Sequence, residues 1–338
     1  MTKHALVVRL DSLGDVLLAG PAVRSVAAGA RKVTLLCGPR GLAAAEMLPG
    51  VDELVCFRAP WIDPEPGPVE PAVVDALVRD LRDREIDEAL VLTSFHQSAL
   101  PTALVLRLAG IPVVAAVSED YPGSLLDVRH HVSGDLHEVE RALSLVGTLG
   151  YRLPPGDDRR LAVETPPATP PAGPYIVFHP GASVPSRAPS PAWCARLVVA
   201  LIAAGRRVLV TGASSERELT ARVAGGEAID LGGKTSFADL AALLAGADCL
   251  VAGNTGPAHL AAAVGTPVVS LFAPVVPAQR WRPWGVPHVL LGDQHAACRN
   301  SRARTCPVAG HPCLDGIAHA AVIAALDELA PASSEAAA

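Results

Sequence analysis

The chain of 338 residues lacks the features of several protein classes. No stretch approaches the roughly 18 consecutive apolar residues of a membrane helix, and the N-terminus enters an apolar strand rather than a signal peptide. No cluster of Lys and Arg offers a surface for phosphate backbones, and the net charge is −6. We therefore expect a soluble, cytoplasmic protein with no nucleic-acid partner and at most peripheral membrane contact, and we take it to act as a monomer.

Two further patterns are missing. The chain has seven cysteines, an odd number, and four of them stand in apolar or neutral surroundings, which is not the pattern of a disulfide framework. A reducing compartment fits them. Neither half of the chain follows its first strand with Gly-x-Gly-x-x-Gly, and this disfavours a nicotinamide-dependent dehydrogenase.

What the chain does have is a regular alternation of apolar strands and helices, which predicts an α/β fold with parallel sheets covered on both faces. Ser190 and Ser236 have the positions of helix N-caps, and Pro21 should kink or break the first helix. We expect strands near residues 4–10, 33–37, 54–57, 88–92, 113–117, 175–178, 208–210, 249–251 and 268–272, and helices near 69–84, 98–108, 137–149, 190–204, 214–224, 236–245, 256–264 and 316–329.

The proline-rich segment 152–174 divides this pattern into two halves. It predicts an N-terminal domain over residues 1–151, a linker over 152–174 and a C-terminal domain over 175–315. A last helix follows over 316–330, and the small, polar tail 331–338 should be disordered.

Four turns that join a strand to a helix carry small and polar residues. Such turns at the carboxyl edge of a parallel sheet expose backbone N–H groups at the positive end of a helix dipole, which suits a phosphate or a sugar hydroxyl. In chain order they are Ser12-Leu13-Gly14-Asp15, His179-Pro180-Gly181-Ala182, Gly212 with Glu216 four residues later, and Thr255-Gly256 with His259 three residues later.

Together the four motifs resemble the bacterial heptosyltransferase family, glycosyltransferase family 9, over nearly the whole chain. The resemblance implies the GT-B fold, with two Rossmann-like domains that face each other across a cleft. It also implies an inverting, metal-independent transfer of a sugar, heptose from ADP-heptose, to the hydroxyl of a glycan or small-molecule acceptor. The acceptor would bind to the N-terminal domain and the nucleotide sugar to the C-terminal domain, and the last helix would return to the N-terminal domain.

On the acceptor side, the resemblance implies that Asp15 is the catalytic base. An ionised carboxylate at a helix start is stabilised by the helix dipole, so the alternative is that Asp15 only caps its helix. Asp11, Ser12 and Gly14 would surround the acceptor. Asp11 is a second candidate base, or a solvated turn residue.

On the donor side, Arg187, Ser183, Thr255 and Gly256 would bind the diphosphate, because a guanidinium can contact two phosphate oxygens at once. By resemblance, Glu216 would bind the nucleoside, and Asn254 and His259 the sugar. Asn254 stands where many relatives have aspartate, which puts the identity of the donor in doubt. The alternatives are an exposed loop arginine at Arg187, a first-turn helix acid at Glu216, a helix cap at Asn254 and a structural histidine at His259.

No metal or other cofactor is expected, since no Asp-x-Asp pair is present to hold a divalent ion under a diphosphate. The one alternative is a zinc site in the segment 298–313, where Cys298, Cys306 and Cys313 lie near His295 and His311 in sequence. Their spacing fits no compact zinc knuckle, so thiols that pack a loop are the simpler interpretation.

Two rival functions remain open. A nucleotide-sugar epimerase of the same fold would need no acceptor, whereas a transferase releases its nucleotide when acceptor is added. A non-catalytic protein that binds sugar nucleotides would show affinity without turnover and would tolerate replacement of Asp15.

Overall fold

The structure is a computed structural model that describes residues 3–165 and 171–331. The chain divides between residues 164 and 165 into two compact units, each with its own sheet and core. Most of the predicted disordered tail, residues 332–338, lies outside the described residues. Among the described helices, none is both long and apolar enough to cross a membrane.

The sheet of the first unit has six parallel strands in the order β3-β2-β1-β4-β5-β6. Its central strands are apolar and buried on both faces, as expected for a parallel sheet between two layers of helices. The strands are β1 (His4–Arg9), β2 (Lys32–Cys37), β3 (Glu53–Cys56), β4 (Glu88–Val91), β5 (Val113–Val117) and β6 (Val128–His130).

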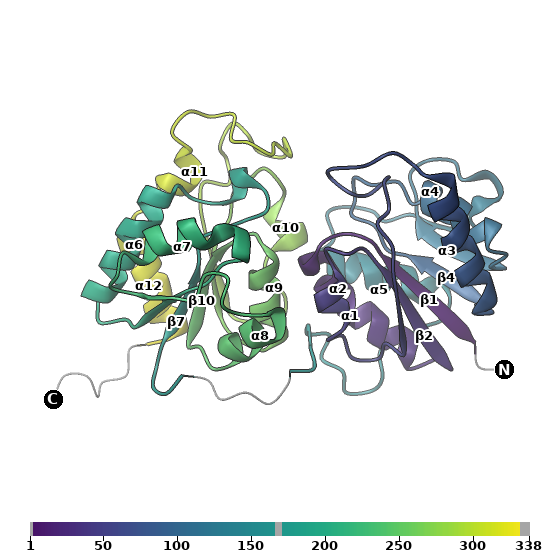
Figure 1. The fold of residues 1–338 in the computed structure, drawn as a ribbon, viewed down its shortest axis with the longest axis horizontal. Coiled ribbons are helices and arrows are strands. Elements are labelled where there is room, and N and C mark those ends of the chain that lie inside the picture. Colours follow the sequence, from purple (N-terminus) through teal and green to yellow (C-terminus); the bar gives the residue numbers. More distant parts are fainter. Residues whose placement is uncertain (1–2, 166–170, 332–338) are drawn as a thin grey trace. The chain divides into compact units, whose positions relative to one another are not determined.

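Helices cover both faces of this sheet (Figure 1). Helices α1 (Leu13–Ala27), α2 (Leu42–Ala45) and α5 (Glu138–Thr148) pack together on one face, and α3 (Pro71–Asp83) and α4 (Leu100–Leu108) pack together on the other. A short 3-10 turn, η1 (Gly123–Leu125), precedes β6. Because β1 leads to α1 on one face and β4 leads to α4 on the other, the carboxyl ends of β1 and β4 form the switch point at which such sheets bind ligands.

The second unit repeats the design, with six parallel strands in the order β12-β11-β10-β7-β8-β9. Its switch point therefore lies between the carboxyl ends of β7 and β10. The strands are β7 (Ile176–His179), β8 (Val208–Val210), β9 (Ile229–Asp230), β10 (Cys249–Gly253), β11 (Val268–Leu271) and β12 (His288–Leu291).

Two layers of helices also cover the second sheet, with α6 against α7 and α12 in one layer and α8 against α9 in the other (Figure 1). The elements are η2 (Pro185–Arg187), α6 (Pro191–Ala203), η3 (Ser214–Glu216), α7 (Arg217–Ala224), α8 (Phe237–Ala245), α9 (Gly256–Ala263), α10 (Ala278–Trp281), α11 (Pro312–Asp315) and α12 (His319–Leu329).

The C-terminal helix, which we predicted to return to the first domain, packs extensively within the second unit. The apolar residues Val322, Ala325 and Leu326 of α12 are buried in the core of the second unit. Arg206, at the amino end of β8, also binds this helix through Asp327 and the carbonyl of Ala330. The apolar face of α12 is therefore buried within the core of the second unit.

The predicted linker is also shorter than expected. Leu161 is buried, Arg24 of α1 forms a bidentate ion pair with Asp157, and the backbone N–H of Glu164 donates to the carbonyl of Met47. Residues 152–164 thus belong to the first unit. Residues 166–170 of the predicted linker lie outside the described residues.

The two predicted N-cap serines cap their helices. The Ser190 hydroxyl accepts from the N–H of Trp193, and the Ser236 hydroxyl accepts from the N–H of Asp239. Pro21 did not break its helix, because α1 continues to Ala27 on buried apolar contacts along its whole length. Of the two expected outcomes, a kink or a break, the break was wrong.

Candidate functional site

Asp15 lies at the switch point of the first unit, in the first turn of α1. Its carboxylate accepts from the Ser12 hydroxyl at 2.7 Å and from the Arg9 guanidinium at 2.9 Å. The side chain remains 19% exposed, so one part of it faces solvent. Asp15 does cap its helix, as the alternative interpretation holds, but the cap leaves the carboxylate accessible to a ligand.

Asp11 is buried, and the prediction of a solvated turn residue was wrong. Its side chain is 7% exposed. It accepts from the Gln97 amide at 2.6 Å and the Ser94 hydroxyl at 3.1 Å, and it pairs with Arg9 at 2.9 Å. Asp11 thus ties the turn after β1 to the turn after β4, and both of its carboxylate oxygens have partners within the protein.

Arg9 is the residue that organises this edge, and the sequence analysis missed it. It ends β1, its side chain is 3% exposed, and it pairs with both Asp11 and Asp15. The neighbouring carboxylates raise the pKa of this guanidinium against the effect of its burial. The available signal was a charge at the end of a fully apolar buried strand, a position that arginine occupies only when it is paired.

In the second unit, Glu216 lies against the turn after β7. A Cβ atom on Gly181 would come within 1.9 Å of Glu216 Oε1, so only glycine leaves room for this carboxylate. Glu216 also accepts from the N–H of Ala213 at 2.7 Å and lies 3.8 Å from His179 Nε2. Burial lowers the pKa of His179, which keeps its ring neutral at neutral pH. The structure thus joins the predicted motifs after β7 and β8.

Arg187 lies beside the turn after β10. A Cβ atom on Gly253 would come within 2.5 Å of the Arg187 carbonyl oxygen, so the backbone of η2 packs directly on the end of that strand. The Arg187 side chain is half-buried, as are Thr255 and Gly256 at the start of α9, whereas Ser183 is exposed. The structure therefore brings the Arg187 backbone to the end of the strand that leads into the Thr255-Gly256 turn.

Asn254 does not cap α9, since Thr255 occupies the N-cap position. The Asn254 side chain is buried, and its amide nitrogen has no hydrogen-bond partner among the described residues. A buried amide without a partner is costly unless a ligand supplies one. His259, on the first turn of α9, is also buried.

The cysteine-bearing loop, residues 298–313, hydrogen-bonds to Ser186 and so holds the turn that contains Arg187. Ser186 donates its N–H to the Arg304 carbonyl at 3.0 Å and its hydroxyl to the Ala303 carbonyl at 2.5 Å. His311 Nε2 donates to the Ser186 carbonyl at 3.1 Å. This support was not predicted, because nothing in the sequence pairs residue 186 with a loop more than 100 residues away.

Two of the three thiols of that loop are buried in the core, and the third, Cys306, is only partly buried. Cys298 and Cys313 are buried in the core of the second unit, and burial raises the pKa of Cys313 to about 11. Within residues 3–165 and 171–331, no group of three or more His, Cys, Asp or Glu side chains has the arrangement of a metal site. The zinc interpretation is therefore not supported for the described part of the chain.

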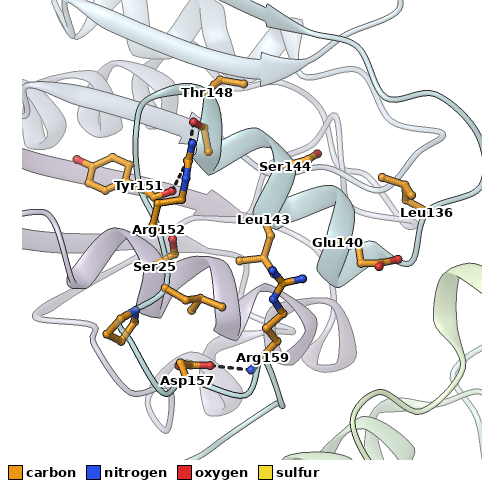
Figure 2. Close-up of a pocket in the computed structure, with 13 residues that line it drawn as sticks. Ser25, Leu136, Glu140, Leu143, Ser144, Thr148, Tyr151, Arg152, Asp157 and Arg159 are labelled. Atoms are coloured by element: carbon orange, nitrogen blue, oxygen red, sulfur yellow. Dashed lines mark hydrogen bonds between the residues drawn. The ribbon is translucent and has the colours of Figure 1, made fainter.

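The first unit also has an open cavity of about 760 Å³ between α5 and residues 151–159 (Figure 2). Glu140, Ser144 and Thr148 line it from α5, and Arg152 and Arg159 from the segment that follows. None of the predicted site residues is among its lining residues. Arg9 does not line it either, so it is distinct from the Asp15 edge.

Two doubly wound units, each with polar turns at its switch point, are the architecture of the GT-B fold. Residues 74–311 match the model of glycosyltransferase family 9 (heptosyltransferase), and the chain belongs to this family. It is therefore a glycosyltransferase. Asp15 lies outside the matched segment, so its role rests on the turn itself.

Solved structures show the same fold. A glycosyltransferase family 9 protein from Veillonella parvula is 17% identical, with a TM-score of 0.78 over 97% of each chain. The ADP-heptose LPS heptosyltransferase II of E. coli is 20% identical, with a TM-score of 0.73 over 97% of this chain and 98% of its own. E. coli heptosyltransferase WaaC, solved with ADP-2-deoxy-2-fluoro heptose, is 22% identical, with a TM-score of 0.69 over 96% and 99%. A search of curated protein sequences found no significant match.

Proposed function

We propose that this glycosyltransferase transfers heptose from ADP-heptose to an acceptor hydroxyl, with inversion at the anomeric carbon and without a metal ion. The observation that carries the proposal is that the switch point of one unit holds a partly exposed carboxylate, Asp15, and the switch point of the other holds an arginine and a helix start. The first suits a base for the acceptor, and the second suits an anionic donor.

In this mechanism Asp15 takes the proton of the acceptor hydroxyl, whose oxygen attacks the anomeric carbon from the face opposite the diphosphate. A single displacement of this kind inverts the configuration at that carbon. The Ser12 hydroxyl and Arg9 hold the carboxylate in position through the hydrogen bonds described above. Ser12 and Gly14 belong to the same turn, which would place the acceptor, while Asp11 anchors that turn.

The second unit would hold the donor. Arg187, Ser183 and the N–H groups at Thr255 and Gly256 would stabilise the charge that develops on the departing diphosphate, so these groups supply the electrostatic help that a divalent ion gives in other transferases. Glu216 would accept hydrogen bonds from the ribose. Asn254 and His259 would contact the sugar, and the buried Asn254 amide would donate to a sugar oxygen.

A thermal-shift panel tests this donor assignment, because a ligand that binds only the native state raises its stability with occupancy. We expect ADP-heptose to raise the Tm more than UDP- or GDP-sugars at equal concentration, by an amount near 2.7 kcal/mol of stabilisation at about 100 times its Kd. EDTA should leave the shift unchanged. A larger shift with UDP- or GDP-sugars would refute ADP-heptose as donor, and a shift that EDTA abolishes and magnesium restores would refute metal independence.

A further inference from the structure

A second layer of buried charge lies behind Asp15. Arg9, which binds Asp15, also faces Glu138 at the start of α5, with Arg9 Nη1 3.6 Å from Glu138 Oε2. Glu138 in turn faces Arg141 one turn later on the same helix, at 3.8 Å. These groups line one small enclosed cavity together with Thr93 and the apolar residues around them. Arg9 contacts both Glu138 and Asp15, so a change of charge at Glu138 changes the electrostatic environment of Asp15 through this one residue.

Glu138 makes no hydrogen bond in the described part of the chain through either carboxylate oxygen, although its side chain is 1% exposed. Burial of a carboxylate without hydrogen bonds costs free energy, and the two nearby arginines offset part of this cost. Its position at the first residue of α5 adds the favourable helix dipole. Leu or Met would fill the same space without the free-energy cost of burying a carboxylate. We therefore assign a role to the negative charge of Glu138 rather than to its volume.

We infer that Glu138 is a positioning residue for the transfer reaction: it shares Arg9 with Asp15 and so keeps Arg9 from neutralising the base. The inference rests on the proposed role of Asp15. With Glu138 ionised, the positive charge of Arg9 interacts with three carboxylates, those of Asp11, Asp15 and Glu138. Asp15 then keeps enough affinity for a proton to take one from an acceptor hydroxyl.

The sign of the effect follows from the charges that act on this cluster. Arg9 comes from β1, Asp11 from the turn after it, Asp15 from α1, and Glu138 and Arg141 from α5. Ser94 and Gln97 add neutral donors from the turn after β4. Removal of the negative charge at Glu138 leaves both arginines less compensated, which lowers the pKa of Asp15. A base of lower pKa is ionised at lower pH and is a weaker proton acceptor.

The test is the pH dependence of kcat/KM in the Glu138→Gln enzyme. We expect its acidic limb to move to lower pH by roughly half a unit to one unit, and its plateau to fall about threefold to tenfold, as general-base efficiency follows base strength. The KM for the nucleotide sugar should not change, because the donor residues lie in the other unit. Arg141→Gln removes a positive charge instead, and should move the acidic limb to higher pH.

Glu88→Gln is the matched control. Glu88 is as buried as Glu138 and lies in the same unit, but at the start of β4, where it accepts from Tyr151 and Lys3. Its replacement should lower the Tm without any shift of the pH profile. A wild-type profile in Glu138→Gln, or shifts of the same sign in Glu138→Gln and Arg141→Gln, would overturn the inference. If Glu138→Gln does not fold, Arg141→Gln alone decides the sign. An active Asp15→Asn enzyme would instead overturn the proposed base itself.

Discussion

Asp15→Asn should lose transfer by a factor of about 100 to 10,000, the range typical of a general base. The substitution keeps the shape of the side chain, and one amide oxygen still accepts from Ser12 or Arg9, so the fold should persist. Donor affinity should hardly change, because the donor residues belong to the second unit. Turnover with saturating donor and acceptor measures the loss, and calorimetric titration of the donor measures the affinity.

Asp239→Asn is the natural control for this variant. Asp239 caps α8 as Asp15 caps α1, since in both cases a serine three residues earlier donates its hydroxyl to the carboxylate at 2.7 Å. If capping were the whole role of Asp15, the two variants would both lose a little stability and both keep their activity. Near-native turnover in a folded Asp15→Asn enzyme would therefore remove Asp15 as the base.

Arg187→Ala should weaken the binding of ADP far more than that of adenosine. A charge-assisted contact is worth about 1.5–3 kcal/mol, which corresponds to a loss of roughly 10-fold to 150-fold in affinity. The Arg187 backbone packs on Gly253 and is held by the loop at Ala303 and Arg304 through Ser186, so truncation of the side chain should leave the turn in place. Calorimetric titrations of ADP and adenosine separate the two contributions.

Arg207→Ala provides the comparison. Arg207 is an exposed arginine at the amino end of β8, where it donates to the Ala172 carbonyl, so it lies at the opposite edge of the same sheet. Arg207→Ala removes one positive charge, as Arg187→Ala does, but it should not change the affinity for ADP. Equal losses in both variants would point to a long-range effect of charge and would contradict a direct contact by Arg187.

The sequence predicted the fold well where local signals agree with burial. Apolar runs gave the central strands, and Ser190 and Ser236 began their helices as expected. The errors concern packing over long distances. The sequence shows that α12 has an apolar face but not which core buries it. Residues 152–164 are held to the first unit by the ion pair between Arg24 and Asp157, which lie 133 residues apart in sequence.

The candidate site was only partly predictable for the same reason. Motifs that share a sheet edge could be grouped from topology, and the structure places Glu216 against Gly181 and Arg187 against Gly253. The supporting residues could not be grouped in this way. Arg9, Glu138 and His311 act through contacts across the sheet or between loops, and a single sequence holds no record of such pairings.

One measurement tests the account most directly: the products formed from ADP-heptose by the wild-type enzyme with a panel of hydroxyl-bearing glycans and small molecules. Mass spectrometry should find one acceptor that gains a heptosyl group, with one ADP released for each product molecule, and the Asp15→Asn enzyme should form neither. ADP-heptose that is altered while no acceptor gains a sugar, or equal yields from the two enzymes, would contradict the account.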